Sequence, residues 1–350
     1  MAYEVTFSAP RRVELCEVPV PEPGPGKVLL RTLYSGISHG TEMAWYRGTA
    51  PQAARAGVRD GLFVDGPSAA SYPCVQGYEE VGEVVAVGEG VRDVRPGERY
   101  ATAHGHRQYA VVDPTGAYFQ RLPDGFDPRH GIFLALGGVA LDALLTSRIR
   151  LGESAAIFGQ GVIGLLLVRL CRLAGVSPII AIDPIASRRE AAFRAGAHYA
   201  FSPDAPNLGQ TIRSYARGRG VDVAFEIAGS YRALHEGFRI TANPYGLVVA
   251  GGFYQGEARG LYLGEEFHHS SHGIGGATRM VALSERIESH AAPWGLRRVL
   301  DTVWRLITEG ALPVGDLITH VFPASRADEA FRLVDEHPDQ CLKVVLDMQG

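Results

Sequence analysis

Cysteine is scarce in this chain of 350 residues. The four cysteines are Cys16, Cys74, Cys171 and Cys341. No two of them have the short spacing of a zinc knuckle or a redox motif, and four are too few for a disulfide framework in a chain of this length. The cysteines therefore argue against a disulfide-stabilised scaffold and predict a reduced, cytoplasmic setting.

Long apolar runs and blocks of like charge are missing as well. The longest apolar runs are far shorter than the ~20 residues that cross a bilayer. The N-terminus, from Met1 to Val5, lacks the basic and apolar regions of a signal peptide. The formal net charge is only −4, and no run of one sign favours nucleic acid or an anionic membrane as a partner. We expect a soluble protein that acts on a small-molecule substrate.

What the chain does contain is typical of a globular protein. Apolar residues make up 46% and charged residues 21%, which is close to the average for folded domains. At ~100–200 residues per domain, the length predicts two domains. The 43 glycines and 21 prolines fit many tight turns between strands and helices.

The first third of the chain has the pattern of a β-rich domain. Short apolar or alternating runs at residues 28–34, 83–87 and 109–113 are bounded by Gly and Pro, as strands joined by turns are. Residues 49–71 are polar and rich in Ala and Gly, without a clear period. Two interpretations stay open for them, a short helix with a lid-like loop and a disordered insertion.

The pattern changes near residue 135, where strands and helices begin to alternate. The expected elements are a helix at 137–150, strands at 154–158, 178–182, 221–225 and 246–250, helices at 162–174 and 186–195, and a tail with a helix at 295–309 and a last strand at 341–347. Buried strands alternating with helices predict βαβ units and a parallel sheet. We therefore expect an α/β fold in which residues 137–290 form the parallel-sheet domain and residues 1–136 and 291–350 form the β-rich domain.

A glycine-rich fingerprint opens the helix that follows the first of these strands. Gly159, Gly161 and Gly164 have G-x-G-x-x-G spacing, and Val162 and Ile163 begin the helix. In a dinucleotide site the first Gly permits the tight turn, the second lets the backbone approach the pyrophosphate, and the third lets the helix pack on the strand. The phosphates then lie at the helix N-terminus.

An acidic residue at the end of the next predicted strand supports the same site. Asp183 follows residues 178–182, where a carboxylate accepts hydrogen bonds from the ribose hydroxyls and repels a 2′-phosphate. This favours NAD over NADP. Arg188 and Arg189 lie close behind and could bind a 2′-phosphate, so the tolerance for NADP stays open.

With this fingerprint in mid-chain, the sequence resembles the medium-chain dehydrogenase/reductase superfamily, which includes zinc alcohol and polyol dehydrogenases. The motifs that carry the resemblance over nearly the whole chain lie at residues 21–28, 35–42, 77–82, 318–323 and 328–331. It implies a GroES-like catalytic domain, a Rossmann domain that binds NAD, and a homodimer or homotetramer. Short stretches at 35–42, 252–254 and 341–343 are most similar to bacteriochlorophyllide (hydroxyethyl) dehydrogenases.

The sequence departs from this family at the positions of the zinc ligands. Tyr78 occupies the place of the histidine in the G-H-E motif, Ser38 or His39 that of the first cysteine, and the third ligand position falls near Ala135 and Leu136. Zinc in proteins needs three or four N, S or O ligands. The cysteine-rich structural lobe is also missing, so the resemblance predicts an enzyme without zinc.

Without a metal, hydrogen-bond donors or a placed acid or base must stabilise the developing alkoxide. Tyr78 is expected to face the cleft, where a phenol donates to a carbonyl oxygen, or acts as acid or base if its pKa is lowered. It could also merely fill the space left by the metal. Glu79 could orient Tyr78 or a substrate hydroxyl; the alternative for Glu79 and Glu80 is an exposed, solvated pair.

Further candidates come from the same resemblance. Ser38, His39 and Thr41 form a cluster comparable to the family's proton relay, although His39 also matches a position that contacts the cofactor pyrophosphate. Glu42 is expected to be structural. Lys343 matches a basic position that reaches the cofactor phosphates; the alternative is a solvated lysine at a strand end.

Histidines supply the last candidates. His268 and His269 belong with His272 to the densest histidine cluster and are expected either to contact substrate or to lie in a surface loop. Two adjacent histidines on an extended chain point in opposite directions, so they do not form a chelate by themselves. His104 and His106 are expected in a loop, with a substrate contact as the alternative for His104.

Together these features predict an NAD-dependent, zinc-independent dehydrogenase that interconverts a secondary alcohol and a ketone. A sugar, cyclitol or other polyhydroxylated natural-product intermediate is the favoured substrate, because buried polar groups specify hydroxyls well. Three alternatives stay open: a hydroxyethyl-tetrapyrrole dehydrogenase, an NAD(P)H-dependent enone or quinone reductase, and a non-catalytic NAD-binding protein.

Overall fold

The computed structural model describes residues 1–350 except 52–54, 56–57, 60–61, 67–71, 243–245, 270–278 and 284–293, and for residues 58–59 the backbone alone. The chain forms two compact units, Met1–Leu136 with Leu300–Gly350, and Gly137–Val299. The first boundary falls inside α2 (Leu134–Ser147) and the second inside α8 (Leu296–Thr308). The expected boundary at 290/291 lies outside the described residues.

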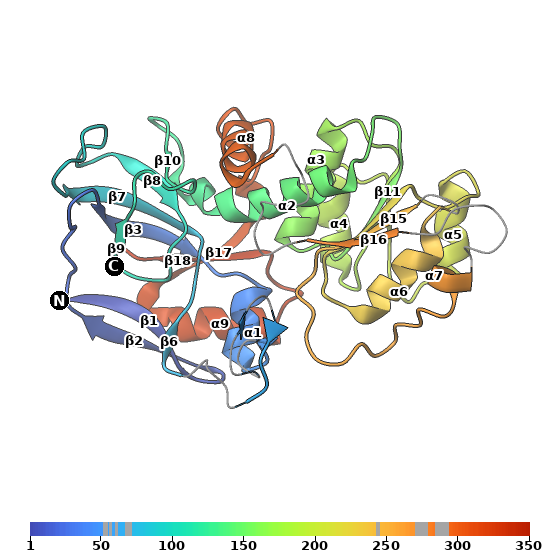
Figure 1. Ribbon diagram of the computed structural model, residues 1–350, viewed down its shortest axis with the longest axis horizontal. Coiled ribbons are helices and arrows are strands. Elements are labelled where there is room, and N and C mark those ends of the chain that lie inside the picture. Colours follow the sequence, from blue (N-terminus) through green and yellow to red (C-terminus); the bar gives the residue numbers. More distant parts are fainter. Residues whose placement is uncertain are drawn as a thin grey trace. The chain divides into compact units, whose positions relative to one another are not determined.

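The first unit is built on two sheets (Figure 1). The smaller one has the order β2 (Arg12–Val18), β1 (Ala2–Ala9), β6 (Cys74–Val75). The larger one has the order β10 (Gln120–Arg121), β8 (Arg99–Thr102), β7 (Glu80–Val87), β3 (Val28–Gly36), β18 (Lys343–Asp347), β17 (Ile318–Pro323), with β9 (Tyr109–Val112) paired to β3. The C-terminal strand β18 therefore lies beside β3. Its first residue, Lys343, comes close to the C-terminal end of β3.

Two helices of the first unit pack on the smaller sheet through an aromatic core. Tyr46 of α1 (Thr41–Arg47) stacks on Phe331 of α9 (Ala327–Glu336), with ring centroids 5.6 Å apart. Phe7 of β1 meets the Phe331 ring edge-on at 5.0 Å. All three side chains are buried, so this cluster holds the C-terminal half of α1 against β1 and α9.

The segment at residues 49–71 lies largely outside the described residues, so neither interpretation of it is tested. Its described part contains a small hairpin, β4 (Val58–Arg59) paired with β5 (Leu62–Phe63).

The second unit is a doubly wound α/β domain, as the alternation of apolar runs predicts. Its six parallel strands have the order β13 (Tyr199–Phe201), β12 (Ile179–Ile182), β11 (Ala155–Phe158), β14 (Val223–Glu226), β15 (Leu247–Ala250), β16 (Arg279–Ala282). In chain order this is 3-2-1-4-5-6, the Rossmann arrangement. The four central strands are buried on both faces, which is why their sequences are apolar apart from Glu226 at the end of β14.

Helices cover both faces of this sheet (Figure 1). Phe158 points into the core cluster formed with α5 (Leu208–Tyr215) and α6 (Tyr231–Ile240). Ile157 points to the other face, where Gly164 of α3 (Val162–Leu173) lies close to it. α4 (Ala186–Ala195) packs against α3. Since β11 has helices on both faces, its carboxyl end opens directly into the glycine-rich turn.

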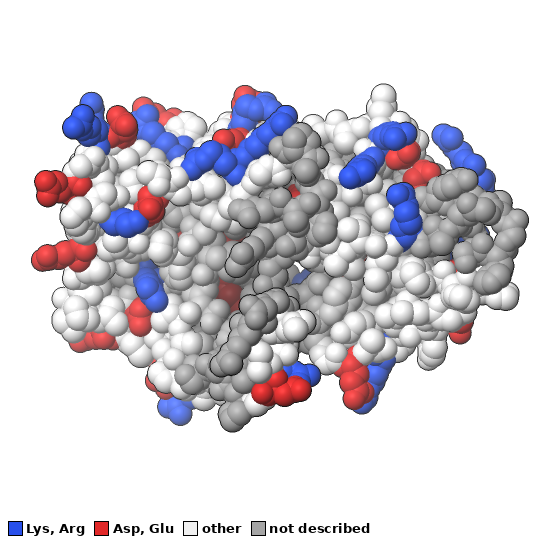
Figure 2. Space-filling view, viewed as in Figure 1, with Lys and Arg blue, Asp and Glu red and all other residues white. Residues whose placement is uncertain are grey.

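One helical segment, Pro128–Ser147, is long and apolar enough to span a membrane by length and composition, a feature that our sequence analysis did not single out. It joins η2 (Pro128–Phe133) to α2. Most of it is buried inside the protein, as is typical of a core helix. Figure 2 shows Lys and Arg interspersed with Asp and Glu on the visible face, without a broad area of one sign.

Candidate active site

The glycine-rich turn of the second unit uses each glycine differently. Gly159 follows β11 with φ +89°, and a Cβ there would lie 3.0 Å from Ala228. Gly161 is the N-cap of α3, and a Cβ there would meet nothing within 4 Å. A Cβ at Gly164 would overlap the carbonyl oxygen of Gly159. The turn therefore leaves its backbone open at Gly161, directly before the N-terminus of α3, where Val162 and Ile163 supply the first helical N–H groups.

Asp183 lies directly beside this turn. Its Oδ2 accepts a hydrogen bond from the backbone N–H of Gln160 at 2.7 Å, and its Oδ1 accepts one from Ile185 at 2.8 Å. An ionised carboxylate has about four acceptor positions, so two donors leave capacity for ribose hydroxyls. Arg189 of α4 donates to the backbone carbonyl of Asp183, and Arg188 is partly buried on the same helix.

Glu226 is a second buried carboxylate at this end of the sheet, which sequence reasoning missed. It ends β14 and accepts hydrogen bonds from the N–H groups of Ala228 and Ser230 and from the Tyr254 hydroxyl, the last at 2.5 Å. Burial raises its pKa. Its partners hold the turn that packs against Gly159.

In the first unit the structure brings together three of the residues singled out from the sequence. The Tyr78 hydroxyl lies 2.6 Å from Ser38 Oγ, and the Thr41 hydroxyl also hydrogen-bonds to it. Ser38 lies in the turn between β3 and α1, Thr41 is the first residue of α1, and Tyr78 lies just before β7. Because β3 and β7 are paired with Ser35 opposite Glu80, the ends of these two strands meet.

The environment of Tyr78 keeps its phenol protonated. Burial raises the pKa of Tyr78 well above its usual value, the charges of Glu79 and Glu42 raise it further, and the hydrogen bonds to Ser38 and Thr41 offset only part of this. One role considered for Tyr78 is that of an acid or base with a lowered pKa. This role is contradicted, because the surroundings raise the pKa. The remaining chemical role is hydrogen-bond donation.

Glu79 and Lys343 form a buried ion pair. Lys343 Nζ contacts Glu79 Oε2 and donates to the carbonyl oxygen of Ile37 at 2.7 Å. Burial raises the pKa of Glu79, and the Lys343 ammonium opposes that rise. Both side chains are almost fully buried, so a solvated glutamate pair and a solvated strand-end lysine are both wrong. The structure gives Lys343 partners other than the phosphates that the resemblance implies.

Glu80 is buried on the opposite face of its strand. It accepts hydrogen bonds from the hydroxyls of Thr32 at 2.6 Å and Thr102 at 2.9 Å. Burial raises the pKa of Glu80 to about 7, against the opposing effect of these hydrogen bonds. These contacts give it a structural place in the sheet.

His106 lies in the loop between β8 and β9, as expected, but inside the protein rather than on its surface. Its imidazole is fully buried, with Nε2 2.7 Å from Glu42 Oε2 and Nδ1 2.7 Å from Ser35 Oγ. Glu42 and His106 are far apart in the sequence, so no local pattern could have paired them. His104, on the same segment, is partly buried, and burial lowers its pKa. His39 is partly buried beside Ser38 in the chain.

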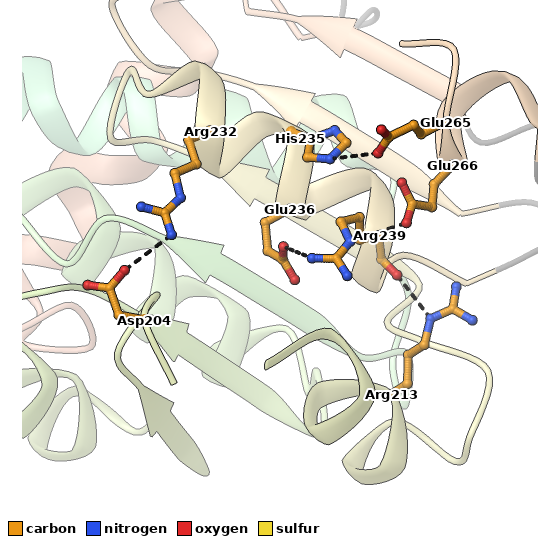
Figure 3. Close-up of polar contacts among 8 residues, drawn as sticks. All are labelled: Asp204, Arg213, Arg232, His235, Glu236, Arg239, Glu265 and Glu266. Carbon is orange, nitrogen blue, oxygen red and sulfur yellow. Dashed lines mark hydrogen bonds and ion pairs between the residues drawn. The ribbon is translucent and has the colours of Figure 1, made fainter. Parts of the chain in front are cut away.

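His268 and His269 of the second unit lie at the surface, one of the two expected placements, but their backbone is helical. His268 and His269 are exposed on α7 (Glu266–His269), a helical turn rather than an extended chain, and His272 lies outside the described residues. α7 is tied to α6 by polar contacts (Figure 3). Arg239 of α6 donates to Glu236 at 2.7 Å and to Glu266 of α7 at 3.2 Å.

One group of possible metal ligands occurs in the described part of the chain. His235, Glu265 and Glu266 offer ligand atoms within 4.8 Å of one another, and His235 Nε2 lies 3.4 Å from Glu265. This group belongs to the second unit, whereas Tyr78 belongs to the first. Arg239 already neutralises part of its charge.

Comparisons with known proteins agree with this architecture. The family model described as alcohol dehydrogenase GroES-like domain matches residues 24–133, and the one described as zinc-binding dehydrogenase matches residues 162–291. The chain is 26% identical to D-guloside 3-dehydrogenase of Escherichia coli strain K12, over 97% of this chain and 98% of that protein. It is 29% identical to 2-desacetyl-2-hydroxyethyl bacteriochlorophyllide A dehydrogenase of Cereibacter sphaeroides, over 99% and 98%.

The butanediol dehydrogenases of Bacillus subtilis are similar in both sequence and structure. (R,R)-butanediol dehydrogenase is 30% identical over 66% of this chain and 71% of its own length. A crystal structure of 2R,3R-butanediol dehydrogenase superposes with a TM-score of 0.79 over 99% of both chains, at 22% identity. With a GroES-like domain, a Rossmann domain and these relatives, the chain belongs to the medium-chain, zinc-type alcohol dehydrogenase family and is an oxidoreductase that acts on alcohols with a nicotinamide dinucleotide.

Proposed function

We propose that the protein is an NAD-dependent dehydrogenase that interconverts a secondary alcohol and a ketone without a catalytic zinc ion. The observation that carries the proposal is the contact between Ser38 and Tyr78, whose hydroxyls lie 2.6 Å apart. By resemblance Tyr78 occupies one zinc-ligand position of the family, and Ser38 or His39 occupies another. The hydroxyl pair takes the place of the metal.

The residues present do not fit a zinc ion at this place. Neutral hydroxyls replace the cysteine and histidine ligands that zinc prefers, and burial keeps Tyr78 protonated. The neighbouring carboxylate of Glu79 is already paired with the ammonium group of Lys343. No step of the proposed reaction therefore involves a metal.

The residues of the second unit fit a dinucleotide. The open backbone at Gly161 and the N-terminus of α3 suit a pyrophosphate, and the Asp183 carboxylate suits ribose hydroxyls and repels a 2′-phosphate. These features favour NAD, with Arg188 and Arg189 as the residues that would permit NADP. When bound, NAD supplies the hydride acceptor for alcohol oxidation.

The hydroxyls of the first unit orient and stabilise the reacting oxygen. Tyr78 donates a hydrogen bond to the carbonyl or developing alkoxide oxygen, the task that zinc performs in relatives. Ser38 and Thr41 can pass a proton, because each hydroxyl both donates and accepts. His39, on the same turn, is the candidate for either the proton exit or a contact to the cofactor.

We propose a polyhydroxylated substrate, such as a sugar, a cyclitol or another natural-product intermediate. Three neighbouring hydroxyls suit hydroxyl-rich substrates, and one full-length relative is named a D-guloside dehydrogenase. A hydroxyethyl tetrapyrrole is the second candidate, favoured by the similarity to the enzyme from Cereibacter sphaeroides. His104, His268 and His269 are further candidates for substrate contact.

The test follows NADH absorbance with purified protein, NAD and a metal chelator, across sugars, cyclitols and hydroxyethyl compounds. We expect turnover with at least one polyhydroxylated compound at a rate that the chelator does not change. Loss of activity in the chelator, restored by zinc, would overturn the zinc-independent reading. NADH binding without turnover, followed by reduction of enones with NADPH, would favour a reductase; binding without either reaction would favour a non-catalytic NAD-binding protein.

We further propose that the enzyme works in the cytoplasm as a homodimer or homotetramer. The four cysteines are free, which supports a reducing compartment. Analytical ultracentrifugation of the purified protein distinguishes these two oligomers from a monomer.

A further inference from the structure

We propose that His106 is a positioning residue for the reaction, and that it acts through Glu42 on the turn that carries Ser38 and Thr41. The kinetic part of this inference rests on the proposed function. The structural part rests on a continuous series of buried hydrogen bonds in the first unit.

The series starts at the imidazole and ends at the phenol. His106 Nε2 donates to Glu42 Oε2 at 2.7 Å. Glu42 Oε1 accepts from the backbone N–H of Ser38 at 3.1 Å. Ser38 Oγ then lies 2.6 Å from the Tyr78 hydroxyl. Each link joins groups within hydrogen-bond distance, so a shift of the imidazole is transmitted to the hydroxyl pair.

Glu42 stabilises the turn before α1 through a hydrogen bond to its backbone. It is the second residue of α1, and its side chain reaches back four residues to Ser38. Ser38 precedes the N-cap residue Gly40, which makes no side-chain cap of its own, so Glu42 is the side chain that ties this turn to the helix. Both hydroxyls that contact Tyr78 lie within the segment that Glu42 closes, so the placement of this carboxylate sets where they point.

The backbone of His106 is anchored against the segment that precedes Tyr78. Its backbone N–H donates to the carbonyl of Gln76 at 3.0 Å, and its own carbonyl accepts from Val5 at 2.8 Å. A Cβ at Gly77, where φ is +115°, would lie 3.0 Å from the His106 backbone nitrogen. The segment before Tyr78 therefore runs in direct contact with the segment that carries the imidazole.

The polar character of this site needs a reason beyond packing. His106 and Ser35 are fully buried, and Glu42 is nearly so; a buried polar group costs free energy unless every partner is in place. Here Nδ1 meets Ser35 Oγ at 2.7 Å, which can donate or accept, so the ring is satisfied whether neutral or charged. An apolar side chain would fill the space but could not orient Glu42.

The first test separates positioning from folding by a pair of substitutions. His106→Phe keeps a ring and removes both nitrogens, whereas His106→Gln keeps a donor for Glu42. We expect His106→Phe to lower kcat by ~10- to 100-fold, since small misplacements of reacting groups have effects of this size, with the KM for NAD unchanged. His106→Gln should recover most of that loss. Thr102→Val, which removes a buried hydrogen bond to Glu80 in the same unit, should leave kcat unchanged.

A double-mutant cycle tests the route of the effect. If His106 acts through Tyr78, the substitution His106→Phe should cost little more in a Tyr78→Phe background, because coupled residues are non-additive. Fully additive losses, equal losses in the Phe and Gln variants, or a kcat unchanged by His106→Phe would each overturn the inference.

A spectroscopic test does not depend on turnover. In protein with isotope-labelled tyrosine rings, the Tyr78 resonance is identified by its disappearance in Tyr78→Phe. We expect it to move in His106→Phe and in Glu42→Gln, and not in Thr102→Val. If His106→Phe does not fold, His106→Leu replaces it, because it also removes both ring nitrogens from the buried site. A Tyr78 resonance that stays in place overturns the inference; one that moves in an enzyme without turnover supports it and counts against the proposed function alone.

Discussion

The carboxylate of Asp183 and the backbone of Gln160 are joined by a hydrogen bond of 2.7 Å between Oδ2 and the N–H. This bond links the end of β12 to the turn that follows β11, so the acidic group and the phosphate-binding backbone are set relative to each other before any cofactor arrives. A preorganised pair of this kind lowers the ordering cost of binding.

Asp183→Ala should weaken NAD binding and relax the discrimination against NADP. Hydrogen bonds to a charged group contribute ~1.5–3 kcal/mol, so we expect the kcat/KM for NAD to fall by ~10- to 100-fold while that for NADP falls less or rises. Steady-state kinetics with both cofactors measure this. Asp183→Asn, which keeps the shape, controls for the loss of the Gln160 contact. An unchanged ratio between the cofactors would show that Asp183 does not contact the ribose.

Gly161→Ala and Gly164→Ala should separate cofactor binding from folding. A methyl group at Gly161 meets nothing within 4 Å and the backbone there has φ −75°, so the fold should keep its melting temperature while NADH affinity falls. A methyl group at Gly164 overlaps the Gly159 carbonyl, so this variant should be destabilised by at least ~1–3 kcal/mol. Thermal unfolding and NADH fluorescence titration measure the two effects. Equal NADH affinity in Gly161→Ala and the wild type would contradict the proposed phosphate site.

Tyr78→Phe should reduce catalysis with little effect on the cofactor. Loss of one hydrogen-bond donor to a developing charge typically costs ~10²–10³-fold in kcat, and the KM for NAD should stay the same. Tyr100→Phe removes another hydroxyl of the first unit, which donates to Glu98 at 2.9 Å, and serves as the matched control. A kcat equal to that of the control would remove Tyr78 from the reaction.

Most of the architecture was predictable because local pattern and tertiary structure agree here. The strands expected at 154–158, 178–182, 221–225 and 246–250 overlap the four buried central strands of the sheet, and the helix expected at 186–195 has those bounds. Burial on both faces leaves a strong sequence signal. The cofactor turn follows from the same logic, since its spacing fixes a strand, a turn and a helix at once.

The polar core of the first unit could not be predicted in the same way. Lys343 meets Glu79, and His106 meets Glu42, across long sequence separations, and nothing in the local pattern of a charged residue tells whether a partner buries it. Because the local sequence does not reveal which charges surround a buried group, it leaves open a lowered pKa for the phenol of Tyr78. Burial, together with the charges of Glu79 and Glu42, raises the pKa of Tyr78 instead.

Glu80 should make the stability of the protein depend on pH. Burial raises its pKa from 4.5 to about 7 in the folded state, so between these values the folded chain holds a proton that the unfolded chain releases. Stability should therefore fall as the pH rises from 4.5 to about 7, by up to about 3 kcal/mol from this group. Denaturant unfolding across this range, compared with Glu80→Gln, isolates the contribution. Parallel curves for the two proteins would show that Glu80 ionises normally.

The ion pair between Glu79 and Lys343 depends on the absence of a side chain at Gly36. A Cβ there would lie 2.7 Å from Glu79 Oε2 and 2.8 Å from Lys343 Cε, so Gly36→Ala should displace the pair and cost ~1–3 kcal/mol of stability. Gly24→Ala is the matched control, because a Cβ at Gly24 meets nothing within 4 Å and the residue lies in the same unit, outside any helix or strand; free energies of unfolding measure both variants.

Removing the Lys343 ammonium group should reduce the stability of the protein more than crowding it with a methyl group at Gly36. Lys343→Met keeps the length of the side chain but leaves the buried Glu79 without its partner, and breaking a buried pair in this way typically costs ~3–5 kcal/mol. The double substitution Lys343→Met with Glu79→Gln removes both charges and should recover much of that loss. Free energies of unfolding for the three variants measure the coupling. If Lys343→Met alone is as stable as the wild type, Glu79 takes up a proton at no cost, and the pair is not what holds β18 to the end of β3.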